Sequence, residues 1–161
     1  MNNVGHTLTK SIGKKDTVIY FAGSIRAGRD DVSVYAEIIS QLKAYGTVIT
    51  EHVGDYKLSD GGQSFLTDKF IHDRDLQWLR QSNIVVAEVT TPSLGVGYEI
   101  ATAIQWRIPV ITLYRQGERA VSAMISGSDN CKHFEYSTIS EAKDFVADVF
   151  SQIGLKVCHE S

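Results

Sequence analysis

The sequence of 161 residues contains only two cysteines, Cys131 and Cys158, and they are far from the CxxC spacing of zinc or redox sites. Two cysteines are also too few for a disulfide scaffold, which favours a reducing compartment, and we expect the cytoplasm and/or the nucleus. The five histidines include no HxH or i,i+4 pair, so the sequence gives no reason to expect a metal.

Long apolar runs and clusters of one charge are also missing. No run reaches the ~18 residues of a membrane span, and the first residues lack the charged-then-apolar order of a signal peptide, so neither is expected. The net charge is −3, without a basic stripe. Phosphate neutralisation needs clustered Lys and Arg, and this argues against nucleic acid as a partner.

Short apolar runs alternate with segments of helical spacing, a pattern typical of an α/β protein. The expected strands are 17–22, 47–50, 84–89 and 108–114, with an edge strand at 132–136. The expected helices are 32–45, 65–81, 96–106, a short one at 122–125, and 141–153 with Ser140 as its N-cap. Polar tails, 1–16 and 154–161, flank a single domain, 17–153.

The strands are nearly continuous runs of Val and Ile, which favours a parallel sheet covered on both faces. We therefore expect a single-domain Rossmann-like (flavodoxin-like) three-layer sandwich with a five-stranded, mostly parallel sheet. In such folds ligands bind at the carboxyl ends of the strands, which directs attention to the loops there.

One of these loops, 91–95, follows the predicted strand 84–89 and opens a helix that contains Glu99. Its Pro, Ser and Gly residues lead into a helix N-terminus, which is a favourable place for an anion. The carboxyl group of Glu99 has two possible roles at this stage. It either complements the helix dipole or points at a ligand that the loop holds.

The loop after the first strand carries glycines, a serine and two arginines. Gly23 and Gly28 permit tight turns, while Ser24, Arg26 and Arg29 suit the binding of one phosphate group. The loop matches neither the Walker GK[ST] motif nor GxGxxG. An ordinary glycine-rich loop with solvated arginines is an equally good reading of these residue types.

Two further residues lie on the predicted ligand side, Asp75 on the helix 65–81 and His52 after the second strand. Taken alone, Asp75 fits a solvated helix residue. A single histidine such as His52 is more often structural than functional.

Taken together, these segments resemble the 2'-deoxynucleoside 5'-phosphate N-hydrolases of the nucleoside 2-deoxyribosyltransferase superfamily. The resemblance runs in order from about Thr17 to Phe150. Its matching segments are YFAGSIR at 20–26, GTVITEHV at 46–53, DLQWL at 75–79, VAEVT at 86–90, PSLGVGYE at 92–99 and SAMI at 122–125.

The resemblance implies cleavage of the N-glycosidic bond of a deoxynucleoside monophosphate without a cofactor. Glu99 would be the nucleophile, Asp75 a general acid/base, and Tyr20 would orient the carboxylate or the sugar, roles consistent with glycoside cleavage by two carboxyl groups. The implied substrate-binding residues are Gly23, Ser24, Ile25, Arg26, Ala27, Gly28, Arg29, Ile38, His52, Ser93, Gly95, Gly97, Ser122, Ala123 and Met124. Ser122 would act in the neighbouring subunit's site, which implies a homodimer.

Three alternatives stay open: base exchange by a nucleoside 2-deoxyribosyltransferase, a hydrolase of ribonucleotides such as CMP, and a non-catalytic nucleotide-binding module. Relatives that act on ribonucleotides tend to carry Phe at the position of Tyr20, so Tyr20 favours the deoxy sugar. The sequence does not identify the base, and 5-hydroxymethyl-dUMP is one candidate substrate.

Overall fold

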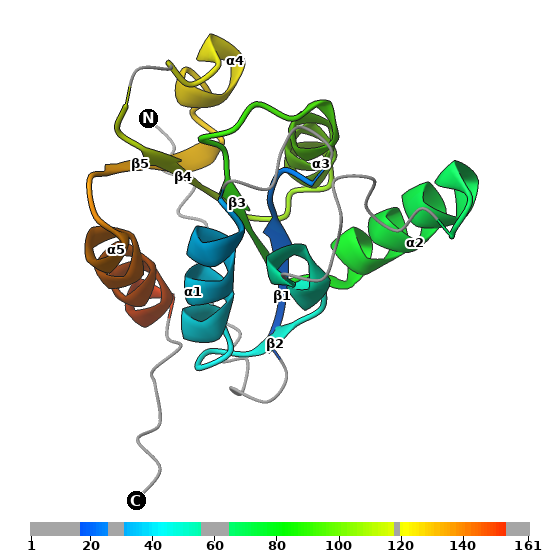
Figure 1. Cartoon of the computed structure of the whole chain (residues 1–161), viewed down its shortest axis with the longest axis horizontal. Helices are drawn as coiled ribbons and strands as arrows, with labels where there is room; N and C mark the ends of the chain where they lie inside the picture. The colour runs from blue at the N-terminus through cyan, green and yellow to red at the C-terminus, as the bar shows by residue number, and fades with distance from the viewer. Residues whose placement is uncertain (1–16, 26–30, 56–64, 118–119, 154–161) are drawn as a thin grey trace, which may run out of the picture.

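The computed structural model describes residues 17–25, 31–55, 65–117 and 120–153 (Figure 1). Both predicted tails lie outside the described residues. So do four predicted substrate contacts, Arg26, Ala27, Gly28 and Arg29.

The sheet has the order β2-β1-β3-β4-β5, and every pair of neighbouring strands is parallel. Its strands are β1 (Val18–Ala22), β2 (Thr47–Val48), β3 (Ile84–Glu88), β4 (Val110–Arg115) and β5 (Cys131–Tyr136). The helices are α1 (Val32–Leu42), η2 (Glu51–Gly54, a 3₁₀ turn), α2 (Asp68–Gln81), α3 (Leu94–Gln105), α4 (Ala123–Ser126) and α5 (Ile139–Gln152). This arrangement confirms the predicted α/β fold. The strand order reverses between β1 and β3, and ligands bind at this point in such sheets.

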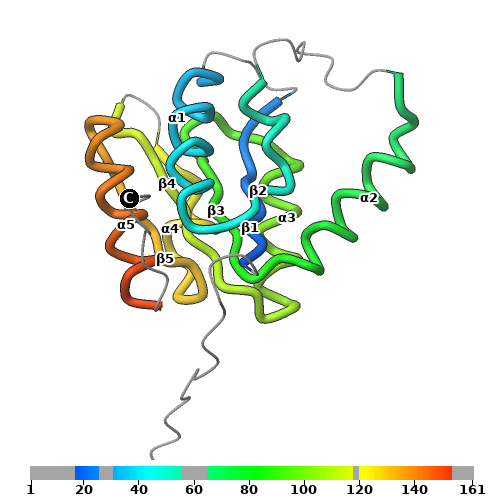
Figure 2. The backbone as a smooth tube through the Cα atoms, turned by 90° about the horizontal axis from the view of Figure 1, so that it is seen from below, coloured from blue at the N-terminus to red at the C-terminus, as the bar shows by residue number. Residues whose placement is uncertain are grey.

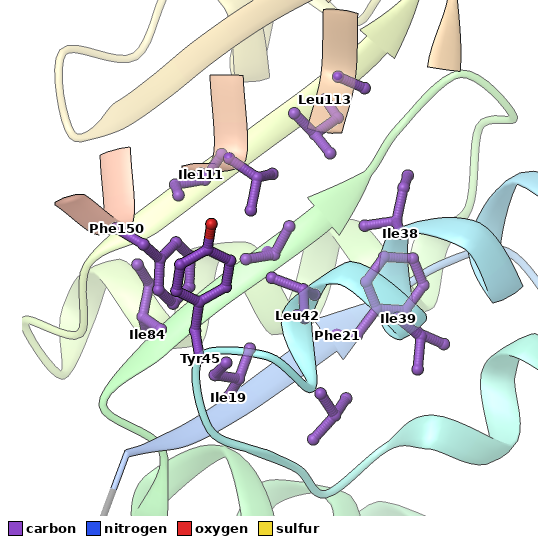
Figure 3. Close-up of a cluster of buried hydrophobic side chains, with 14 of the residues drawn as sticks. Ile19, Phe21, Ile38, Ile39, Leu42, Tyr45, Ile84, Ile111, Leu113 and Phe150 are labelled. Atoms are coloured by element: carbon purple, nitrogen blue, oxygen red, sulfur yellow. The ribbon is translucent and has the colours of Figure 1, made fainter. Parts of the chain in front are cut away.

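Side chains of β1 alternate between the two faces of the sheet, as the strand period of two requires. Ile19 and Phe21 pack in a core cluster with α1 and α5 (Figure 3), whereas Tyr20 and Ala22 pack in a second cluster with α2 and α3. The three layers therefore place Tyr20 on the α2/α3 face.

The structure places Ile38, one of the predicted substrate contacts, in the core. We expected a substrate contact, but its side chain is only 1% exposed and lies in the α1/α5 core cluster near Phe21 and Leu42 (Figure 3). The helical spacing of α1 points Ile38 into the sheet, because this position belongs to the buried stripe of an amphipathic helix.

The second strand is shorter than predicted, since β2 ends at Val48 and a turn follows. The Thr50 hydroxyl accepts a hydrogen bond from the Phe21 N–H (2.8 Å) and donates one to the Phe21 carbonyl (2.7 Å). A side chain thus replaces the strand ladder at this point. His52 consequently lies on η2 instead of at a strand end.

The helix boundaries follow their capping residues. Ser93 caps α3 by accepting a hydrogen bond from the Val96 N–H, so α3 begins at Leu94. The last helix is capped by Thr138, and the prediction of Ser140 was wrong. The Thr138 hydroxyl accepts from the Glu141 N–H at 3.3 Å, while the Glu141 carboxylate accepts from the Ser137 N–H at 2.8 Å. This reciprocal pattern resembles a capping box, which stabilises the earlier start.

Figure 2 shows α2 extending away from the sheet, and Leu79 near its end is its buried residue. Phe70 is 53% exposed on the projecting half of α2. Among the described helices none has the length and apolar character needed to cross a membrane.

Candidate active site

A tyrosine on β1 and a glutamate on α3 meet on the α2/α3 face of the sheet. The Tyr20 hydroxyl donates a hydrogen bond of 2.6 Å to Oε1 of Glu99. Tyr20 is 1% exposed, and Glu99 lies in the second turn of α3, after the Ser93 cap. The loop between β3 and α3 therefore brings the predicted nucleophile to the residue that was predicted to orient it.

Burial changes the acid–base properties of both groups. The pKa of Glu99 is raised to about 7. Burial is the largest cause, the Tyr20 hydrogen bond acts in the opposite direction, and the negative charge of Asp75 also raises this pKa. Burial also raises the pKa of the Tyr20 hydroxyl strongly, with the Glu99 charge adding to the effect. Tyr20 therefore stays a neutral hydrogen-bond donor at physiological pH.

Asp75 on α2 completes a group of three, because its charge acts on both Tyr20 and Glu99. The neighbouring Arg74 donates to Oδ1 of Asp75 through Nε (2.9 Å) and Nη2 (2.8 Å). Both contacts use the same oxygen of Asp75. The ion pair with Arg74 therefore does not use Oδ2 of Asp75.

Aromatic rings line the same end of α2. The Arg74 guanidinium lies over the Trp78 ring at 4.4 Å from its centroid, and the His52 ring lies 6.0 Å from Trp78. His52 on η2 thus contacts α2 at Trp78, which is three residues after Asp75. Sequence analysis did not single out Arg74 or Trp78, although both follow from the helical spacing around Asp75. Trp78 also packs against the α2/α3 core cluster.

The β1–α1 loop contributes a buried serine. Ser24 is 0% exposed, its N–H donates to the Tyr35 hydroxyl at 3.2 Å, and its own hydroxyl has no hydrogen-bond partner within the described part of the chain. Buried hydroxyls are normally hydrogen-bonded, so this one suits a ligand. Gly23 is also buried, and a Cβ there would lie 3.1 Å from the Tyr35 ring. Ile25 is partly buried against the core.

The first turns of α3 contain two glycines that packing does not explain. A Cβ on Gly97 would meet nothing within 4 Å, and a Cβ on Gly95 would meet only the Ser93 hydroxyl, at 3.7 Å. Glycine in a helix interior costs about 1 kcal/mol relative to alanine. This open face beside Ser93 leaves room for a close approach to the helix backbone.

The predicted substrate contacts at α4 form hydrogen bonds within their own helix start. The Ser122 hydroxyl accepts from the Met124 N–H at 3.3 Å, which caps α4 itself. Met124 is 84% exposed, and Ala123 is exposed beside it. These residues are therefore available at the surface of the subunit.

The site chemistry rests on carboxyl, hydroxyl and backbone groups. Within residues 17–25, 31–55, 65–117 and 120–153, His, Cys, Asp and Glu side chains form no group of three that could hold a metal ion. Tyr20, Asp75 and Glu99 come together as predicted, with His52 at one side. Ser24 lies on the β1–α1 loop, Ser93 caps α3, and Gly95 and Gly97 lie in its first turns.

Comparison with known proteins decides the family. The model of the family described as nucleoside 2-deoxyribosyltransferase matches residues 19–152. The chain belongs to this family. A 5-hydroxymethyl-dUMP N-hydrolase of Tetraodon nigroviridis is 47% identical over 137 residues, which cover 84% of this chain and 92% of that protein.

Two mammalian proteins of the same name are similarly related. The 5-hydroxymethyl-dUMP N-hydrolase of Mus musculus is 50% identical over 119 residues, 73% of this chain and 69% of the mouse protein. That of Homo sapiens is 46% identical over 119 residues, 73% of this chain and 68% of the human protein. The resemblance found in the sequence is thereby confirmed at the level of the family.

Proposed function

We propose that this protein hydrolyses the N-glycosidic bond of 2'-deoxynucleoside 5'-monophosphates, releasing the free base and 2-deoxyribose 5-phosphate. Its membership of the nucleoside 2-deoxyribosyltransferase family and its similarity to three N-hydrolases support this activity. The observation that carries it is the hydrogen bond from Tyr20 to Glu99 in a buried setting beside Asp75.

Glu99 is the nucleophile in this proposal. Its carboxylate attacks the anomeric carbon C1' as the bond to the base breaks, through a transition state with oxocarbenium character. Asp75 donates a proton to the departing base and then accepts one from the water that attacks C1'. The bond between Glu99 and C1' breaks in this second step, so the carboxylate is regenerated and water supplies the new hydroxyl. Tyr20 orients Glu99 through its hydrogen bond.

The two loops bind the 5'-phosphate. Ser24 offers its buried hydroxyl on one side, and Ser93 with the open face at Gly95 and Gly97 offers backbone and hydroxyl groups on the other. A helix N-terminus favours a negative charge there. Arg26 is the predicted cationic partner and lies outside the described residues. Phosphate binding away from C1' fixes the sugar, and its binding energy helps to reach the transition state.

His52 and Trp78 are at the end of the site where the base is placed in this proposal. The three named relatives act on 5-hydroxymethyl-dUMP, and we propose this nucleotide as a substrate. Tyr20 favours a deoxy sugar, since the related ribonucleotide hydrolases tend to carry Phe at this position.

We also propose that the protein is a homodimer in which Ser122 completes the site of the neighbouring subunit. Large apolar side chains are exposed on or next to α2, α3 and α4: Phe65 (82%), Phe70 (53%), Leu94 (97%), Tyr98 (53%) and Met124 (84%). Exposed apolar surface of this kind typically marks an interface. The ring contact of His72 with Tyr98 joins α2 to α3 at this surface.

Mixing two impaired variants tests the shared site. In a heterodimer of Glu99→Gln and Ser122→Ala subunits, one site combines an intact Glu99 with the partner's intact Ser122. Activity that rises on mixing supports Ser122 acting across the dimer. A mixture with no more activity than the separate variants, or a monomer in analytical ultracentrifugation, contradicts it.

The reaction is tested by incubating the purified protein with deoxynucleoside and ribonucleoside 5'-monophosphates, including 5-hydroxymethyl-dUMP, and separating the released bases by chromatography. Free base from a deoxy monophosphate, but not from the unphosphorylated nucleoside, is the expected result. Release only after addition of an acceptor base would indicate base exchange. Release only from CMP would indicate a ribonucleotide hydrolase, and binding without release a nucleotide-binding module.

A further inference from the structure

Two buried carboxyl groups take no part in the reaction proposed above. Glu88 ends β3 at 0% exposure, and Asp31 immediately precedes α1 at 3% exposure. Both lie toward the α1/α5 side of the sheet, opposite Tyr20 and Glu99. Buried carboxyl groups need compensating partners, and the partners of these two connect the loops of the site.

Asp31 occupies the N-cap position of α1, but its side chain makes no capping hydrogen bond. An aspartate at this position ordinarily accepts from the helix N–H groups. Here Oδ2 accepts from the Thr91 hydroxyl at 2.8 Å, and Oδ1 forms an ion pair with Nη2 of Arg115. The carboxylate thus joins the start of α1 to the β3–α3 loop and to the end of β4.

Glu88 forms hydrogen bonds with Thr90, the residue next to Thr91. Its carboxyl group accepts hydrogen bonds from the hydroxyl and the N–H of Thr90 and, at 2.9 Å, from the Tyr136 hydroxyl on β5. The Thr90 hydroxyl also accepts from the Arg115 N–H at 2.8 Å. Two consecutive threonines are therefore fixed by two carboxyl groups, and Ser93 follows two residues later.

The first turn of α1 also controls the other side of the proposed phosphate site. The Tyr35 N–H donates to the Asp31 carbonyl at 2.9 Å, and the Tyr35 hydroxyl accepts from the Ser24 N–H at 3.2 Å. Ser24 is thus linked to Asp31 through Tyr35, and Ser93 is linked to Asp31 through Thr91. One residue connects the two loops that carry the predicted phosphate contacts.

On the basis of the function proposed above, we infer that Asp31 is a positioning residue for the substrate's 5'-phosphate. Its carboxylate holds the Ser93 side of the site through Thr91 and Arg115, without touching the phosphate. Its backbone carbonyl accepts from the Tyr35 N–H, and the Tyr35 hydroxyl accepts from the Ser24 N–H on the other side. Small displacements of binding groups can cost large factors in rate, which makes such a connection important for phosphorylated substrates.

Asp31→Asn tests this inference because it keeps the shape of the side chain and removes its charge. We expect the affinity for inorganic phosphate and for 2-deoxyribose 5-phosphate, measured by titration calorimetry, to fall about tenfold or more. KM for the deoxynucleotide should rise by a similar factor, with a smaller change in kcat. Thr91→Val should have a weaker effect in the same direction. Arg115→Lys should retain more affinity than Arg115→Gln because it keeps the charge.

Glu37→Gln is the matched control, since Glu37 forms an ion pair with Lys143 on the solvent side of the same helix. It should leave the affinity for phosphate unchanged. Wild-type phosphate affinity in both Asp31→Asn and Thr91→Val would overturn the inference. So would a loss that is equal for phosphorylated and unphosphorylated substrates, as expected of a structural role alone. A wild-type protein that neither binds phosphate nor cleaves a deoxynucleotide would contradict the proposed function itself.

Discussion

The Tyr20 hydroxyl donates a 2.6 Å hydrogen bond to Oε1 of Glu99, and this bond opposes the effect of burial on the carboxyl group. Burial raises the pKa of Glu99 to about 7, so the nucleophile loses its proton close to neutral pH. A group poised in this range changes charge at little cost during a catalytic cycle.

Tyr20→Phe removes the only one of these influences that lowers the pKa of Glu99. We expect the pKa of Glu99 to rise further, so that the acid limb of the kcat/KM profile moves to higher pH. The shift is measured against the wild type with the same substrate, whose own phosphate ionisation is common to both profiles. Tyr98→Phe is the control, because it removes an exposed hydroxyl from α3, the helix that carries Glu99. It should leave the acid limb in place. If the acid limb does not move in Tyr20→Phe, the ionisation that it reports is not that of Glu99.

Glu99→Gln should lower turnover by several orders of magnitude, because an amide cannot replace the carboxylate as a nucleophile. The Gln carbonyl can still accept from Tyr20, and binding of 2-deoxyribose 5-phosphate should be largely intact. Single-turnover kinetics and calorimetry measure the two effects separately. Glu135→Gln, an exposed change on β5, should retain wild-type turnover. Near-normal turnover in Glu99→Gln would exclude Glu99 as the nucleophile.

The raised pKa of Glu99 also predicts that the free energy of unfolding depends on pH, and Glu99→Gln tests this. Because the pKa of Glu99 rises from 4.5 in the unfolded chain to about 7, the folded state binds the proton more tightly. This stabilisation is fully present below pH 4.5 and is lost as the pH rises through about 7. Glu99→Gln should therefore gain stability over the wild type with rising pH, by at most about 3 kcal/mol at pH 8. Urea unfolding at pH 5 and pH 8 measures this difference, and a difference that does not grow with pH would contradict the prediction.

Much of the site could be predicted because its signals are local. An apolar strand followed by a Pro/Ser/Gly loop and a helix start is legible in the sequence, and Ser93 caps α3 at that point. The alternation of side chains along β1 likewise fixes the face of Tyr20 once its neighbours Ile19 and Phe21 are buried on the other face. These features depend on residues within a few positions of one another.

The partners of Asp31, in contrast, are distant in sequence and could not be predicted. Thr91 is 60 positions away in sequence and Arg115 is 84, so no local pattern connects them. In the sequence Asp31 has the appearance of an ordinary N-cap residue. The early end of β2 escaped prediction for a similar reason, because the Thr50 side chain bonds to Phe21 on the neighbouring strand.

Gly97→Ala should stabilise the protein and weaken its binding of the deoxynucleotide. A Cβ at this position would meet nothing within 4 Å in the free subunit, so alanine should stabilise α3 by up to about 1 kcal/mol. The added methyl group occupies the open face beside Ser93, and KM for the deoxynucleotide should rise. Ala101→Gly, on an exposed part of α3, is the inverse control and should lower stability without changing KM. A more stable Gly97→Ala variant with unchanged KM would remove Gly97 from the binding site.

Arg107 marks the end of α3 and offers a change that should stabilise the protein without touching the site. Its φ is 60°, the left-handed region, and its N–H donates to the Ile104 carbonyl while the Ile108 N–H donates to the Ala103 carbonyl. This is the Schellman arrangement, in which glycine is preferred because a Cβ costs about 1 kcal/mol. Arg107→Gly should therefore gain roughly 0.5–1 kcal/mol, reduced from the full amount by the greater freedom of glycine in the unfolded chain. Thermal unfolding should show a rise of about 2–4 °C per kcal/mol, with unchanged kcat/KM. Arg107→Ala keeps the Cβ and should gain nothing, so equal stability of the two variants would show that the left-handed backbone carries no strain.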